Sequence, residues 1–100
     1  MPNLILDVPH TLGQAPALER LKNKFSLAKD MYQAHISHLQ EEWNDTGLTF
    51  DFRAAGMNVS GTLAVEEAAV KLKAHLPLAA LLFKGAIEKQ VREELERLLR

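Results

Sequence analysis

The clearest pattern in the chain is a regular alternation of apolar and polar residues over three neighbouring segments, 48–53, 57–65 and 68–75. A period of two is typical of β-strands that bury one face and expose the other. Only short reversals, at 54–56 and 66–67, separate these segments, so consecutive strands are expected to pair. We therefore predict a three-stranded antiparallel meander with one apolar and one polar face.

Helical periodicity flanks this meander on both sides. After Pro16, apolar residues recur at steps of three and four as far as Leu39, which predicts a first helix of about six turns. A second helix is predicted from Pro77 to the end of the sequence, because proline is tolerated in the first helical turn. Before the first helix, the apolar run Leu4–Val8 predicts a further strand. The stripe of the second helix that should cross the sheet consists of Phe83, Ile87, Val91, Leu95 and Leu98.

The order of these elements is β-α-β-β-β-α, which predicts an α+β fold. We expect a single domain over residues 1–100, built as an antiparallel four-stranded sheet with two long helices packed on one face. A sequence of 100 residues is long enough to bury one stable core. A long terminal helix held against an antiparallel sheet is also the arrangement of helix-grip, START-like folds, and this chain would be a reduced helix-grip-like version. That likeness concerns the fold and says little about function.

Composition narrows the classes of function. Apolar residues make up 47% of the sequence, charged residues 25%, and the net charge is -1, so no basic surface is available for nucleic acid or an anionic membrane. The sequence has no cysteine, which excludes disulfides, thiolate metal sites and cysteine nucleophiles. No stretch approaches the ~18 consecutive apolar residues of a transmembrane helix, and the N-terminus lacks the features of a signal peptide. We expect a cytoplasmic protein with no transmembrane segment and no nucleic-acid partner.

The start of the last predicted helix holds more apolar side chains than one core-facing stripe can use. Leu78, Leu81 and Leu82 lie around the helix from the stripe that should meet the sheet. Two interpretations stay open: either the first helix and the first strand enclose these leucines, or they form an exposed patch for a second protomer, an apolar surface or an acyl chain. Burying three leucines would supply on the order of 5 kcal/mol, at ~1.5–3 kcal/mol each, before the cost of association.

Few polar residues are arranged for chemistry. His35, His38 and Glu42 would share one side of the first helix, at a spacing that can hold a metal ion. His35 also belongs to the apolar stripe, where a histidine is more often a core residue, so we predict no metal site and no cofactor. Trp43 is better explained as a lid over the end of the sheet than as a ligand contact. The sequence has no nucleophile elbow, phosphate loop or H-E-x-x-H motif, so we predict no catalytic residues.

A family resemblance rests on the order and spacing of several short segments: Pro9–Gly13, Ala17–Leu21, Glu42–Asn44, Gly61–Val65, Leu76–Ala80, Phe83–Gly85 and Ile87–Glu88. Together they resemble the polyhydroxyalkanoic acid system family, over essentially the whole sequence. These are small bacterial proteins tied to storage-polyester metabolism and described as granule-associated or regulatory. The resemblance implies that metabolic context in a bacterial cytoplasm. It carries over no active site.

From these observations we expect a non-enzymatic protein of the polyhydroxyalkanoate system. It would act by hydrophobic association in granule formation or regulation, as a homodimer or against the granule surface or granule proteins. The contact residues would be Leu78, Leu81, Leu82 and Phe83.

Two alternatives remain from other classes of function. One is a small helix-grip-like module that holds an acyl or hydroxyacyl chain in an apolar cavity lined by Phe50, Phe52 and Met57, with Phe83. The other is an enzyme of hydroxyacyl metabolism that depends on His35 or Asp51.

Overall fold

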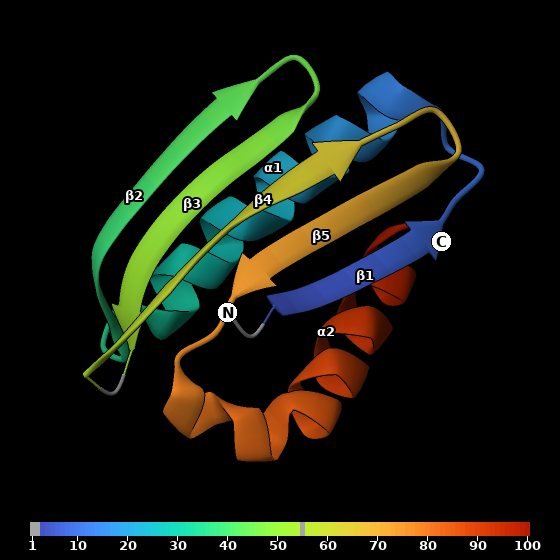
Figure 1. The fold of residues 1–100 in the computed structure, drawn as a ribbon. Coiled ribbons are helices and arrows are strands. Elements are labelled where there is room, and N and C mark those ends of the chain that lie inside the picture. Colours follow the sequence, from blue (N-terminus) through green and yellow to red (C-terminus); the bar gives the residue numbers. More distant parts are fainter. Residues whose placement is uncertain (1–2, 55) are drawn as a thin grey trace.

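The computed structural model of the chain describes residues 3–54 and 56–100. Within these residues the chain forms five strands, two α-helices and one 3-10 helix, η1 (Figure 1). The predicted reversal between the first and second segments of the meander includes Ala55, which lies outside the described residues. In chain order the elements are β1 (Asn3–Pro9), α1 (Gln14–Tyr32), β2 (Ile36–Asn44), β3 (Gly47–Ala54), β4 (Met57–Val65), β5 (Ala69–His75), η1 (Leu78–Phe83) and α2 (Lys84–Leu98).

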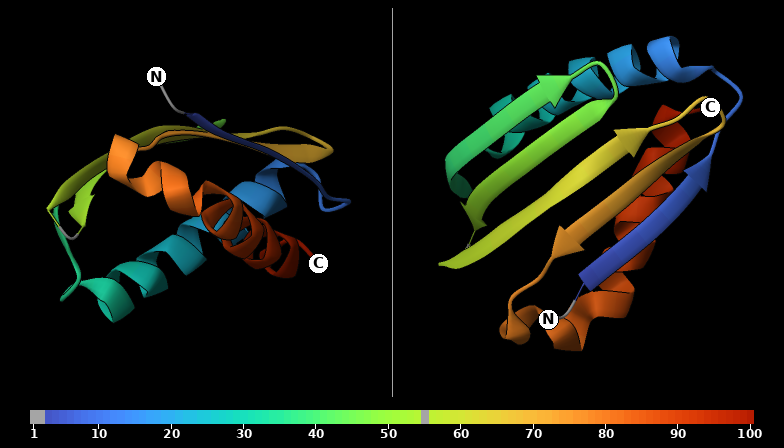
Figure 2. Two further views of the ribbon diagram at one scale, coloured as in Figure 1. Left: turned by 60° about the horizontal axis from the view of Figure 1, so that its bottom comes forward. Right: turned by 45° about the horizontal axis from the view of Figure 1, so that its top comes forward.

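The strands form one antiparallel sheet in the order β1-β5-β4-β3-β2. Strand β1 pairs with β5, so the first strand closes one side of the predicted meander β3-β4-β5. Both α-helices lie on the same face of the sheet (Figures 1 and 2). The α+β class, the meander and the one-sided helical layer are therefore confirmed.

The predicted number of strands is wrong, because the first helix ends at Tyr32 and residues 36–44 form the strand β2. A β-bulge between Ser37 and Gln40, with His38 at a φ of 54°, adds one residue to this strand. The bulge shifts the apolar positions from a period of two, so Ile36 and Leu39 are three residues apart and mimic a helical step. Glu41 and Glu42 follow, and two acidic residues in a row are typical of a solvent-exposed helix end.

The core lies between the sheet and the helices, and it is best covered at the β1–β5 side. Val65 and Val70 form a cross-strand pair, and both are buried. The pairing of β4 with β5 also requires Gly61, because a Cβ atom there would lie 2.4 Å from the carbonyl oxygen of Lys73. The close approach to this glycine comes from the backbone of the neighbouring strand β5. The largest fully buried side chains are Leu4, Leu6, Val8, Val65 and Val70.

The last predicted helix is divided in two. Residues Leu78–Phe83 form η1, and the α-helical pitch begins only at Lys84. A 3-10 helix has three residues per turn, so side chains before and after Lys84 do not continue one stripe. Phe83 was predicted to lie in the core-facing stripe, but 62% of it is exposed. The rest of the stripe, Ile87, Val91, Leu95 and Leu98, does pack on the core.

Candidate association surface

The segment Leu78–Phe83 is an apolar projection from the end of β5. Leu78 is 75% exposed, Leu81 40%, Leu82 89% and Phe83 62%. Of the six residues in η1 only Ala80 is buried. These side chains are therefore exposed. Of the two interpretations that the sequence allowed, the structure has the exposed patch and not the leucines enclosed by the first helix and the first strand. We refer to Leu78, Leu81, Leu82 and Phe83 as the apolar turn.

A second pair of exposed apolar side chains lies on α1. Leu27 is 56% exposed and Met31 74%. They occupy the helix face that also carries Arg20, because positions 20, 27 and 31 are close to whole turns apart. Arg20 donates to the carbonyl oxygens of Leu98 and Arg100, so this face of α1 points toward α2. Sequence reasoning missed this pair, although two apolar residues outside the helix stripe were a visible signal.

The two helices are close at one end and separate at the other. Figure 2 shows the end of α2 beside the first half of α1, whereas η1 and the end of α1 lie apart. Because of this divergence, the face of α1 that carries Leu27 and Met31 meets no other helix of the described residues in its last turns.

The core face of β3 and β4 is incompletely covered near the end of α1, where the two helices are apart. Along β3, burial falls from Leu48, which is buried, to Phe50 and Phe52, which are half-buried. Along β4, Met57 and Val59 are half-buried, whereas Leu63 and Val65 farther along are buried. The rings of Phe50 and Phe52 stack with their centroids 6.1 Å apart. We refer to Phe50, Phe52, Met57 and Val59 as the open corner of the sheet.

Trp43 is held in place by residues of the fold. Its ring meets the ring of Phe25 edge-on, with centroids 5.7 Å apart, and Lys22 lies over it at 5.8 Å. The indole Nε1–H donates to the carboxylate of Glu41, which also pairs with Lys29 at 3.1 Å. Trp43 thus fastens β2 to α1, as a half-buried residue within a strand.

The candidate metal ligands do not share a helix face. His35 lies in the turn before β2, His38 occupies the bulge, and Glu42 is an exposed residue of β2. The helical spacing on which that candidate depended is therefore wrong. Across residues 3–54 and 56–100, no group of three or more histidine, aspartate or glutamate side chains is arranged to hold a metal ion.

The opposite face of the sheet is polar and open. Cross-strand pairing places Asp51, Ser60 and His75 in one row of β3, β4 and β5. Thr62 and Lys73 form part of the next row. These residues line an open depression, and Asp51 and His75 are exposed. Asp51 thus lies on the polar face that the alternation of the meander predicts.

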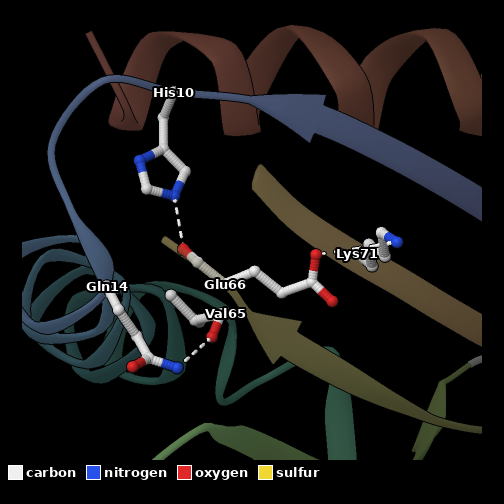
Figure 3. Close-up of polar contacts among 5 residues, drawn as sticks. All are labelled: His10, Gln14, Val65, Glu66 and Lys71. Atoms are coloured by element: carbon white, nitrogen blue, oxygen red, sulfur yellow. Dashed lines mark hydrogen bonds and ion pairs between the residues drawn. The ribbon is translucent and has the colours of Figure 1, made fainter. Parts of the chain in front are cut away.

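His10 is a buried polar residue at the junction of β1 and α1 (Figure 3). Its Nδ1 accepts a hydrogen bond from the amide of Leu12 at 3.2 Å, so Nε2 carries the proton and donates to the carbonyl oxygen of Glu66 at 3.0 Å. Nearby, the side-chain amide of Gln14 donates to the carbonyl oxygen of Val65 at 2.8 Å. Both contacts join the start of α1 to the β4–β5 connection, so His10 has a structural role that its sequence position did not suggest.

Within the part of the chain that the structure describes, no helix is both long enough and apolar enough to span a membrane.

Comparison with known proteins identifies a family for the chain. No curated protein and no solved structure matches the chain. A family model described as "Putative polyhydroxyalkanoic acid system protein" matches residues 5–99, which include every helix and almost all of the sheet. The chain therefore belongs to the polyhydroxyalkanoic acid system protein family.

Proposed function

We propose that this protein acts in polyhydroxyalkanoate granule formation or regulation by hydrophobic association, without catalysing a reaction. The apolar turn is its contact surface, and its partners are a second copy, the granule surface or granule proteins. Family membership supports the metabolic context. The protein would then work in the cytoplasm, in part on granules.

The observation that carries this proposal is the exposure of the apolar turn. Large apolar side chains exposed singly are ordinary, but adjacent ones mark surfaces that meet a partner. Here four large apolar side chains lie within six residues, and Leu82, the most exposed of them, is 89% exposed to solvent. Covering the exposed part of these four side chains would supply roughly 4–8 kcal/mol before the cost of association, at ~1.5–3 kcal/mol for each fully buried side chain. This gain is comparable to the cost of association, about 4–15 kcal/mol, so it favours a partner that covers further surface as well.

The proposal is tested by fractionating cells that accumulate the polyester. Wild-type protein should sediment with the granules, and Leu82→Asp should move it to the soluble fraction, because a carboxylate cannot enter an apolar contact without loss of hydration. The matched control is Ile5→Asp, since Ile5 is 66% exposed on the opposite face of the sheet. Circular dichroism should show that both variants keep the fold. Equal granule fractions for all three proteins would refute the proposal.

The open corner favours a second candidate function, the binding of an acyl or hydroxyacyl chain. Phe50, Phe52 and Met57 are half-buried on the core face, as a chain-binding surface requires. In that case a monomer should take up one fluorescent fatty acid with saturation, and Phe52→Ala should weaken the uptake more than Ile5→Asp. A linear, unsaturable signal would exclude this function.

A further inference from the structure

The apolar turn is too small to form a stable dimer by meeting only its own copy. Standard protein interfaces involve about 20–30 residues on each partner. The turn offers four large side chains, of which Leu81 is only 40% exposed. A stable contact between two copies therefore has to recruit a second surface.

The open corner and the exposed face of α1 supply that second surface. Leu27 and Met31 extend it from the open corner across the diverging end of α1. All of these side chains are uncharged, and the net charge of -1 leaves little repulsion between copies. Figure 2 shows η1, the end of α1, the end of β3 and the start of β4 at the same end of the molecule, where the helices diverge.

We infer that two copies of this chain pair about a two-fold axis, with the apolar turn of each copy packed against the open corner and the end of α1 of the other. About a two-fold axis, every contact occurs twice. When a projection and a receiving surface lie side by side on each copy, each projection therefore meets the receiving surface of the other copy. This inference rests on the role proposed for the apolar turn, and it specifies what that turn contacts.

A second copy explains the exposures better than a small ligand does. An acyl chain in the open corner would cover Phe50 and Phe52, but Leu82 projects from η1 and would stay in water. Reciprocal packing covers the projecting residues and the half-buried corner in one contact. It also accounts for the exposed side chain of Met31. That side chain does not belong to the core, and a ligand in the open corner would not need it.

The inference is tested by sedimentation and by NMR on a mixed sample. Sedimentation of the wild-type protein should show a dimer whose share rises with concentration. In a sample of equal parts isotope-labelled and unlabelled protein, isotope-filtered spectra should show contacts between the methyl groups of Leu82 in one copy and the ring of Phe52 in the other. The methyl groups of Ile5 should show none.

Met31→Asp provides a variant test that should not disturb folding, because Met31 is 74% exposed. It should weaken dimerisation about tenfold or more, a change of about 1.4 kcal/mol, whereas Ile5→Asp should leave the dimer intact. A monomer at every concentration, contacts of Leu82 only with Leu82, or a monomer that binds a fluorescent fatty acid would each overturn the inference. Loss of granule binding in Leu82→Asp, found together with a monomeric wild type, would overturn this inference and leave the proposed function standing.

Discussion

Arg20 of α1 donates a hydrogen bond to the carbonyl oxygen of Leu98, 3.1 Å away at the end of α2. The same guanidinium also donates to the carbonyl oxygen of Arg100. The last carbonyl groups of a helix have no partner within the helix, so a guanidinium there satisfies them and favours the negative end of the helix dipole. The contact holds the two helices together at one end, and they diverge from it toward the apolar turn.

Replacing Arg20 should loosen this end of the helical layer. Arg20→Ala removes both hydrogen bonds and should lower the free energy of unfolding by about 1 kcal/mol, because the site is exposed. Urea denaturation measures this loss, and hydrogen exchange should show faster opening of the last turn of α2. Lys89→Ala, at an exposed position of α2, is the control. Equal stabilities for the two variants would show that Arg20 does not hold the helices.

Two glycines should respond in opposite ways to the same substitution. Gly61→Ala places a methyl group 2.4 Å from the carbonyl oxygen of Lys73 and 2.8 Å from the Cα of Ala74. It should destabilise the fold by about 2–3 kcal/mol or more, because backbone atoms of a paired strand cannot move aside cheaply. Gly85→Ala meets no atom within 4 Å and should stabilise α2 by up to about 1 kcal/mol. Thermal unfolding of both variants checks the prediction, and a Gly61→Ala variant as stable as the wild type would contradict it.

The hydrogen bonds of His10 should contribute to stability. His10→Phe keeps a ring in the site but leaves the amide of Leu12 and the carbonyl of Glu66 without this partner, which should cost about 1–3 kcal/mol. Urea denaturation measures the cost, with His75→Phe on the exposed sheet face as the control. Nitrogen NMR should find neutral His10 protonated at Nε2. Protonation at Nδ1, or equal stability of the two variants, would contradict the contacts in Figure 3.

The carboxylate of Glu94 should titrate below its ordinary range. A hydrogen bond from Arg97 lowers the pKa of Glu94 in the folded state. The pair therefore stabilises the fold at pH values above the pKa of an unfolded glutamate, and this contribution is lost as the pH falls through the lowered pKa. In Arg97→Ala the NMR titration midpoint of Glu94 should rise, because the hydrogen bond that favours its charged form is lost. An unchanged Glu94 midpoint would mean that the pair does not form in solution.

The meander and the helical layer were predictable because their patterns are regular. From Leu48 to Phe52 and from Leu63 to Val65, every second side chain faces the core, and no bulge interrupts the alternation. Strand β2 was not predictable in the same way. Its bulge at His38 breaks the period, and Glu41 occupies a core-facing position where it pairs with Lys29 and Trp43. A charged residue at a core-facing position breaks the alternation of apolar and polar residues by which a half-buried strand is recognised.

The candidate site, too, was predictable only in part. The surplus of leucines near Pro77 was visible in the sequence, because more apolar residues occurred than one helix face can bury. The change from 3-10 to α-helical pitch at Lys84 was not visible, and it is what turns Phe83 outward. The open corner depends on the angle between two helices, which long-range contacts such as that of Arg20 set and local sequence does not encode.

The central claim is that the apolar turn is covered by a partner when the protein is at work. The chain has no cysteine, so Leu82→Cys and Ile5→Cys each introduce a single thiol whose alkylation rate reports its accessibility. The direct measurement is that rate in cells that accumulate the polyester, compared with the rate in dilute purified protein. The account predicts strong protection in cells at position 82 and none at position 5. Equal rates in cells at the two positions would contradict it.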